Sequence, residues 1–338
     1  MSSTTVVRSA DAPVPGTGAL VSLSQPWAGR LAASSAWLAA AALTSFWPDK
    51  IDSDWPYTGM FGLALGIFGF AIGASLIGGL WVAPLQQLRR FAPWLIVLAL
   101  FVATWELVTA KLGLLPMPFF PPPQAIVEVL IDDWLRLGEG VLASLRLLAG
   151  GYLFGAAVGF ATGVSIGWSR ALGYWIHPVL RLVGPLPATA WLPLAFFVFP
   201  SSWSASTFLI ALATGFPVTV LTWSGVASVN SAYYDIARTL GGSQRFLVFK
   251  VAIPAAMPHV FVGLFMGLGN SFAVLVVAEM LGVKSGLGWY LQWAQGWAAY
   301  ANMYAALLIM ALACSALITL LFRLRDRLLS WQKGLVRW

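Results

Sequence analysis

Long apolar stretches separated by short polar segments make up most of this chain. A helix that crosses about 30 Å of hydrocarbon needs roughly 20 apolar residues, because each residue adds about 1.5 Å. About eight stretches come close to that length. They are Leu31–Trp47, Tyr57–Val82, Ala92–Ala110, Val141–Trp168, Leu182–Phe199, Ala205–Ala227, His259–Leu281 and Met303–Phe322. The pattern predicts an all-α, polytopic membrane protein with about eight transmembrane helices.

The fifth stretch is the weakest of these candidates, because it contains Pro185, Pro187 and Pro193. Proline removes a backbone donor and clashes with the preceding helical turn. We therefore expect this segment to be kinked or partly broken. Neighbouring helices must then satisfy the carbonyl groups that the prolines release.

Two further segments are not expected to span the membrane. Leu115–Pro123 is rich in proline and is predicted to be extended, leading into an outer-face helix over residues 124–137. Gly286–Tyr300 is too short and too polar to span. Three tryptophans recur in it every four residues, namely Trp289, Trp293 and Trp297. That spacing suits a helix at the membrane interface, where indole rings prefer to lie, and it fits a buried aromatic stripe equally well.

Composition excludes a soluble protein. Hydrophobic residues make up 59% of the 338 residues and charged residues only 9%, against about 25% in soluble domains. A soluble fold could not cover so much apolar surface, so a cytosolic enzyme is excluded. The net charge of +7 implies no nucleic-acid partner, because most of the cations fall in loops on one side of the predicted membrane.

Those cations also predict the orientation of the chain. Cytoplasmic loops are enriched in Lys and Arg, and most of the 19 cations lie before the first stretch, after the last, or in loops on that same side. Both termini are therefore expected in the cytoplasm, with the chain in a bacterial cytoplasmic (inner) membrane. Residues 1–28 are rich in Ser, Thr, Ala, Pro and Gly and predict a disordered cytoplasmic tail.

Three ionisable residues fall within the apolar stretches and are candidates for function. Glu106 lies near the outer end of the third stretch and is expected to reach the interface. Arg146 lies near the outer end of the fourth. A pairing of Arg146 with Glu139 is favoured over contacts with lipid or backbone carbonyls, and over attraction of an anionic substrate. Glu279 lies in the outer half of the seventh stretch, where a structural or gating role is expected.

The sequence carries no pattern of catalytic residues. His177 and His259 are far apart and have no neighbouring ligand pattern, so no metal site is expected. There is no Ser/His/Asp or Cys/His set, and no glycine-rich phosphate loop ending in Gly-Lys-Ser/Thr. The chain is therefore expected to have no catalytic residue and to bind no cofactor.

The longest predicted cytoplasmic loop, residues 228–258, reads as two helices joined by glycine. Asn230 or Ser231 can cap the first helix, and Gly241 with Gly242 stops it. Ser243 can cap a second helix, Gln244–Val251, which is expected to end before Pro254. Apolar residues on these helices require cover from a partner protein, or alternatively from the bundle itself.

This loop resembles the cytoplasmic loop of binding-protein-dependent ABC transporter permeases. That family's pattern is Glu-Ala-Ala, then Gly four residues after the second Ala, then a hydrophobic-x-Pro ending. The matching segment is DIARTLGGSQRFLVFKVAIPAAMP. Asp235, Ile236 and Ala237 stand at the first three positions, Gly241 is the glycine and Pro254 closes the pattern. Asp in place of Glu keeps the charge, whereas Ile236 in place of Ala is a departure.

Three further segments strengthen the resemblance. Ala143-Ser144-Leu145-Arg146, with Gly150 or Gly151 and Gly155, resembles the family's first core helix. Two others resemble the nitrate, sulfonate and taurine branch: PLPATAWLPLAFFVF over Pro185–Phe199, and Ala278-Glu279-Met280-Leu281-Gly282 followed by Ser285-Gly286-Leu287-Gly288. The resemblance covers residues 92–338, which would form the transmembrane domain of a type I ABC importer. It departs at Pro200, where glycine is usual, and does not explain residues 29–91, an extra transmembrane hairpin.

The resemblance implies partners and roles. Two copies of the permease would pair around a central pathway, two ATP-binding subunits would hydrolyse ATP with Mg²⁺, and a periplasmic binding protein would deliver the substrate. The residues implied in coupling to the ATPase, within the loop 231–254, are Asp235, Ile236, Ala237, Arg238, Leu240, Gly241, Gly242, Ile253 and Pro254. Those considered for the pathway or gating are Arg146, Pro187, Pro193 and Glu279.

The leading hypothesis for function is an ATP-driven importer of a small anion, such as a sulfonate, taurine, nitrate or bicarbonate. An alternative is a permease of the same family for an aromatic acid or a vitamin precursor. An ion-coupled secondary transporter is an alternative of another class. It would require paired intramembrane carboxylates or repeated halves with broken helices, and the sequence shows no clear repeat.

Overall fold

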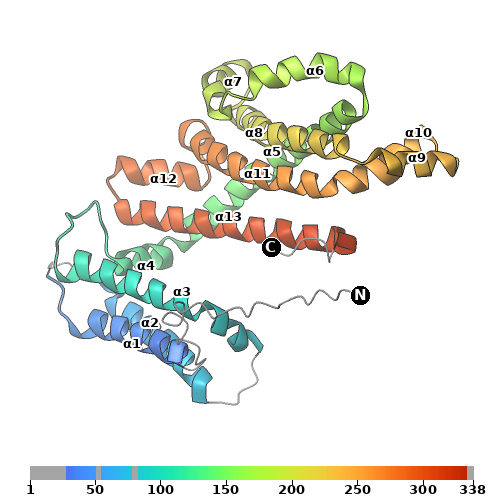
Figure 1. Cartoon of the computed structure of the whole chain (residues 1–338). Helices are drawn as coiled ribbons and strands as arrows, with labels where there is room; N and C mark the ends of the chain where they lie inside the picture. Colours follow the sequence, from blue (N-terminus) through green and yellow to red (C-terminus); the bar gives the residue numbers. More distant parts are fainter. Residues whose placement is uncertain (1–27, 51–54, 78–82, 333–338) are drawn as a thin grey trace, which may run out of the picture. The chain divides into compact units, whose positions relative to one another are not determined.

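The computed structural model describes residues 28–50, 55–77 and 83–332, and every element in them is helical (Figure 1). The predicted tail, residues 1–28, lies almost wholly outside the described residues. The chain divides into two compact units, Met1–Glu128 and Val129–Trp338. The prediction placed the boundary after residue 91, so the first unit contains the third predicted span as well as the hairpin.

In the first unit, three helices pack around a small apolar core. They are α1 (Ala28–Phe46), α2 (Thr58–Ile77) and α3 (Ala83–Glu106), which continues as a π-helical turn η1 (Leu107–Lys111). Trp37, Leu65, Ile72 and Ala99 are buried together in the core. Helix α4 (Pro123–Asp132) crosses the boundary between the units and is shorter than the predicted helix over 124–137.

A buried ionic cluster ties α1 to the end of α3. The ammonium group of Lys111 lies 2.7 Å from the Asp49 carboxylate and 3.7 Å from that of Glu106. It also donates to the backbone carbonyls of Thr44, in the last turn of α1, and of Trp47, which follows the helix, at 3.0 and 2.6 Å. Carbonyls in the last turn of a helix have no partner within it. The prediction that Glu106 reaches the interface is wrong, because this side chain is fully buried beside Lys111.

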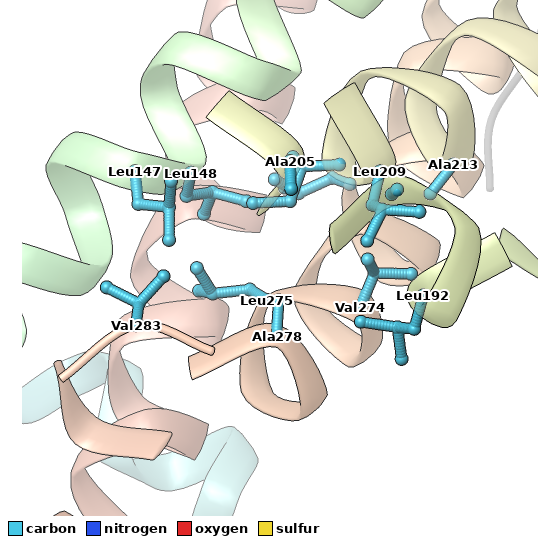
Figure 2. Close-up of a cluster of buried hydrophobic side chains, with 13 residues drawn as sticks. Leu147, Leu148, Leu192, Ala205, Leu209, Ala213, Val274, Leu275, Ala278 and Val283 are labelled. Atoms are coloured by element: carbon cyan, nitrogen blue, oxygen red, sulfur yellow. The ribbon is translucent and has the colours of Figure 1, made fainter. Parts of the chain in front are cut away.

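The second unit is built on three long helices, α5 (Trp134–Trp168), α8 (Ser202–Ala227) and α11 (Ile253–Leu281). Figure 2 shows their shared core, where Leu147 of α5, Leu209 of α8 and Leu275 of α11 meet. The glycines of α5 allow close packing on α8, since a Cβ on Gly155 would meet Ala211 Cα at 2.8 Å. The remaining long helix, α13 (Tyr300–Leu328), packs beside α11 and α12 (Leu287–Gly296).

Five helical segments in the described residues are long and apolar enough to cross a membrane, or six if one bent pair counts as a span. The bent pair contains the fifth predicted span. Helix α6 (Arg170–Val183) is followed by η2 (Ala188–Trp191) and α7 (Leu192–Val198), with a bend of 87° between them. The expected break is therefore present, and it lies at the Pro185–Pro187 turn. The first two predicted spans correspond to α1 and α2, which fall below that criterion.

The loop segment between α8 and α11 is more continuous than the sequence suggested. Helix α9 (Ser231–Thr239) is followed by α10 (Gln244–Phe246), a π-helical turn η3 (Leu247–Ala252) and α11, and the last three form one helical segment ending at Leu281. The prediction of a separate helix ending before Pro254 is wrong. The π-turn includes Lys250, four residues before Pro254, where a proline ring crowds the carbonyl group of a regular α-helical turn.

Candidate functional site at the 228–258 loop

A polar side chain caps the first turn of each of the two loop helices, α9 and α10. The side chain of Asn230 accepts from the Ala232 N–H at 2.9 Å at the start of α9, and Ser243 accepts from the Phe246 N–H at 3.3 Å at the start of α10. Each cap satisfies a backbone donor that has no partner within its helix. Both caps were predicted, and for α9 the structure selects Asn230 over Ser231.

The turn between the helices depends on Gly241. Its φ is +82°, a conformation that costs a residue with a Cβ about 1–2 kcal/mol. Nothing lies within 4 Å of a Cβ built there, so conformation rather than space selects glycine at this position. At Gly242, by contrast, a Cβ would meet the Ala237 carbonyl oxygen at 2.7 Å. Together the two glycines reverse the chain tightly enough to place α9 and α10 side by side.

This turn creates an open apolar hollow of about 460 Å³. Four large side chains surround it, and we call them the loop surface: Tyr233, Ile236, Leu240 and Phe246. All four are exposed, and Leu240 reaches 83%. Exposed apolar patches of this kind are typical of protein interaction sites.

The opposite side of the loop is packed on the bundle. Tyr234 meets Trp168, the last residue of α5, in an edge-to-face contact with ring centroids 5.8 Å apart. Ala237 and Leu247 are buried, and Val226 of α8 is buried with Ala252 and Ala256 beneath them. The loop is therefore in packed contact with the ends of α5, α8 and α11.

The structure brings together only part of the predicted coupling set. Ile236, Ala237, Leu240, Gly241 and Gly242 line the hollow. Outside it, Asp235 and Arg238 form an exposed ion pair at 3.3 Å. Ile253 and Pro254 stand at the start of α11. Tyr233 also lines the hollow but was not among the predicted coupling residues. It precedes Ile236 by three residues and Leu240 by seven, a spacing that places all three on one helix face.

At the opposite end of the second unit, Glu279 holds the start of α12. This side chain is 1% exposed. Its Oε2 accepts from the Ser144 hydroxyl at 2.9 Å and from the Gly288 N–H at 2.8 Å, while Ser144 Oγ accepts from the Leu287 N–H at 2.9 Å. A carboxylate at a helix N-terminus also opposes the positive end of the helix dipole. Glu279 therefore has a structural role in joining α5, α11 and α12.

The four candidate pathway residues are scattered. Arg146 is exposed on α5, and neither an ion pair nor a hydrogen bond joins it to Glu139 in the described part of the chain, so the favoured pairing is wrong. Pro193 lies in the first turn of α7. Pro187 lines a second hollow of about 340 Å³, between the bend after α6 and the helices α8 and α11. We call it the bend hollow; its polar lining includes Thr189 and Asn270.

The tryptophans of α12 do not form the buried aromatic stripe that was one of the two interpretations of their spacing. Leu287, Tyr290, Leu291 and Ala294 form its buried side, whereas Trp289 and Trp297 are exposed and Trp293 is half-buried. The buried stripe is thus aliphatic with one tyrosine, and the indoles face outward, as an interfacial helix requires.

Comparison with known proteins gives the family. Residues 151–333, more than half of the chain, match the family described as "Binding-protein-dependent transport system inner membrane component". The chain belongs to this family. The match includes the loop surface and Glu279, whereas Ser144 lies before the matched range.

Individual relatives point to one branch. The chain is 29% identical to the nitrate import permease protein NrtB of Synechococcus elongatus, over 74% of this chain and 91% of that one. It is 28% identical to SsuC of Bacillus subtilis, a permease protein named for aliphatic sulfonates, over 71% and 87%. An inward-facing MetNI methionine ABC transporter structure is 16% identical and covers 60% of this chain and 97% of that one, with a TM-score of 0.48.

The chain is therefore an ABC importer permease of the nitrate and sulfonate type, and a permease of this family is not itself catalytic. In the described residues no group of three or more His, Cys, Asp or Glu side chains is placed to hold a metal ion. The described geometry provides an exposed apolar hollow at one end of the second unit, and between its central helices a mainly apolar hollow whose lining includes Thr189 and Asn270.

Proposed function

We propose that this permease imports a small oxyanion, such as a sulfonate, taurine, nitrate or bicarbonate, and that its loop surface receives the ATP-binding subunit. ATP and Mg²⁺ are held by that subunit, two copies of which act with two copies of the permease and a periplasmic binding protein. The loop and both termini then lie in the cytoplasm. Similarity to permeases named for nitrate and for sulfonates supports the choice of substrate class.

The exposed apolar hollow between α9 and α10 is the main support for a role of the loop in coupling. An isolated exposed leucine is common, but Leu240 stands with three further large exposed side chains around a single concavity. The Tyr234–Trp168 contact links that concavity to the end of α5. Closure of the ATP-binding subunits would thereby move α9 and rock the bundle between outward and inward states.

Leu240→Glu tests this proposal. A carboxylate in the hollow must be desolvated when the partner binds, so we expect co-purification with the ATP-binding subunit to fall at least about tenfold, with the permease still folded. Ala232→Glu is the matched control, because Ala232 is exposed on the same helix but does not line the hollow. Equal recovery of the ATP-binding subunit with both variants would remove the loop surface from the interface.

The bend hollow supports a pathway between two copies. Asn270 lies roughly 16 Å along α11 from Leu281, which places it near the middle of a ~30 Å hydrocarbon layer. The residue is exposed in the single chain, and so are Met266 and Gly269 beside it. A lipid-facing amide at that depth is unfavourable. This face of α11 is therefore suited to meet the second permease copy, or a hydrated route along the molecular two-fold axis.

The substrate class is tested by Asn270→Asp. The substitution preserves the shape of the side chain and adds a negative charge to the hollow, which repels an anion. Uptake of an anionic substrate into proteoliposomes should fall by about tenfold or more, while the ATP-binding subunit still binds. Asn270→Ala removes the amide without adding charge and should have a smaller effect. Undiminished uptake by the Asp variant would place the route elsewhere or would mean that the cargo is not an anion.

A further inference from the structure

A third hollow, of about 430 Å³, lies at the end of the second unit opposite the loop surface. The first turns of α5, the segment after α11 and the exposed side of α12 form it. Its lining includes two cations, one carboxylate and two indoles: Arg136, Lys284, Glu139, Trp289 and Trp293. No predicted role in coupling or in the pathway accounts for this group, which we call the basic-indole hollow.

The lengths of the surrounding helices place this hollow at the level of the lipid headgroups. Helix α5 has 35 residues, so it is ~52 Å long and exceeds the ~30 Å of hydrocarbon. Its far end, Trp168, contacts the loop, so Arg136 and Glu139 lie on the opposite side of the membrane. Lys284 comes shortly after Leu281, where the membrane-spanning segment ends. Tryptophans prefer this same depth.

The charges of the hollow favour an anion. Arg136 and Lys284 are both exposed, and the ion pairs of the described residues involve neither of them nor Glu139. The Arg136 guanidinium lies 6.0 Å from the centre of the Trp293 ring, which holds it against α12. Two cations and one carboxylate leave the lining with a net positive charge. Asp133 is nearby but does not line the hollow; its carboxylate accepts from Tyr290 at 2.7 Å and from Asn302 at 3.2 Å.

We propose that the basic-indole hollow binds the phosphate headgroup of an anionic phospholipid from the leaflet opposite the loop surface. Arg136 and Lys284 bind the phosphate, and the indoles of Trp289 and Trp293 cover the glycerol and the first methylenes. A free oxyanion shares the phosphate chemistry but has no apolar body. Since indoles line the hollow beside the cations, its shape and chemistry suit an amphiphile.

The test is titration of the detergent-solubilised full chain with phosphatidylglycerol, with bound lipid counted by native mass spectrometry. Each cation near a membrane surface contributes about fivefold to affinity, so Arg136→Gln with Lys284→Gln should weaken the tightest phosphatidylglycerol site by at least about tenfold. Arg136→Lys with Lys284→Arg keeps both charges and should retain the site. Glu139→Gln removes the only repulsive charge of the lining and should strengthen binding.

Three arms of the experiment can overturn the proposal. Phosphatidylcholine, which has no net charge, should not occupy the site, and inorganic phosphate or methanesulfonate at the lipid concentration should not displace the lipid. Displacement by either free anion would make this a site for a soluble oxyanion instead. Unchanged phosphatidylglycerol affinity in the double glutamine variant, or weaker binding after Glu139→Gln, would exclude the hollow as the lipid site. None of these results depends on coupling to an ATP-binding subunit.

Discussion

The two ends of the second unit are held in different ways. At the loop end, α9 rests on the bundle through apolar contacts such as Tyr234 on Trp168, and its ion pair between Asp235 and Arg238 is exposed. At the other end, α12 is fixed by buried hydrogen bonds that converge on Glu279. Figure 1 shows α9 and α10 at one end of α11, and α12 at its other end.

The loop end therefore depends on apolar packing, whereas the distal end depends on directional hydrogen bonds. Apolar contacts between side chains have no strict direction, so they set fewer geometric requirements than hydrogen bonds do. Buried hydrogen bonds are directional, and a buried polar atom that loses its partner costs about 1–3 kcal/mol. The helices next to the exposed loop surface are thus joined at their distal ends by buried hydrogen bonds.

Among substitutions that compare the two ends, Glu279→Ala is expected to lower the free energy of unfolding most. The Ser144 hydroxyl and the Gly288 N–H lose their acceptor in a buried site, and a void remains. We expect a loss of about 3 kcal/mol or more of unfolding free energy, measured by thermal unfolding in detergent. Ile236→Ser, on the exposed loop surface, should change stability by less than about 0.5 kcal/mol.

Glu279→Gln is the matched variant, since its amide oxygen can still accept from both donors. It should lose clearly less stability than Glu279→Ala. If the two variants were equally destabilised, the negative charge rather than the accepted hydrogen bonds would be the important property. If neither variant were destabilised, the packing of α12 on α5 and α11 would not depend on Glu279. The proposed difference between the two ends of the second unit would then be wrong.

A smaller loss is expected from Tyr290→Phe at the same end. The Tyr290 hydroxyl donates to Asp133 at 2.7 Å and accepts from Asn302 at 2.6 Å. Removing it should cost about 1–3 kcal/mol of stability, because one partner is a carboxylate. Asn302 still donates to Asp133 at 3.2 Å, which limits the loss.

The stabilisation that Tyr290 provides is expected to decrease as the pH rises. Burial raises the pKa of Tyr290 to about 12, from a usual value of 10.0. The folded state therefore holds the phenolic proton more tightly than the unfolded state. The resulting stabilisation is complete below about pH 10 and is lost as the pH rises towards 12. Tyr290→Phe should make the loss of stability between about pH 10 and 12 smaller than in the unsubstituted protein, and an equal loss in both would contradict the assignment.

The sequence predicted local features well. The apolar stretches gave the long helices, because their length reflects the thickness of the bilayer. Gly241 and Ser243 marked the turn and the cap, since both depend on neighbours in the chain. The family resemblance to the nitrate and sulfonate branch is confirmed by the match over residues 151–333 and by the relatives.

Long-range polar partners could not be predicted in the same way. Ser144 and Glu279 are far apart in the chain, and only the packing of α5 on α11 brings them to the start of α12. For the same reason the sequence does not predict that Lys111, just after the third apolar stretch, is buried against the end of α1. Asn270 was not predicted as a pathway residue. Its exposure depends on which face of α11 the neighbouring helices leave uncovered, and the sequence does not show this.

The central claim is that the loop surface, and not the distal end, contacts the ATP-binding subunit. The chain has a single cysteine, Cys314, so Cys314→Ser provides a background in which Leu240→Cys or Ser285→Cys can carry a benzophenone photo-crosslinker. In membranes containing the assembled transporter, the label at position 240 should crosslink to the ATP-binding subunit, and the label at position 285 should not. Crosslinking of that subunit at position 285, or its absence at position 240, would contradict the account.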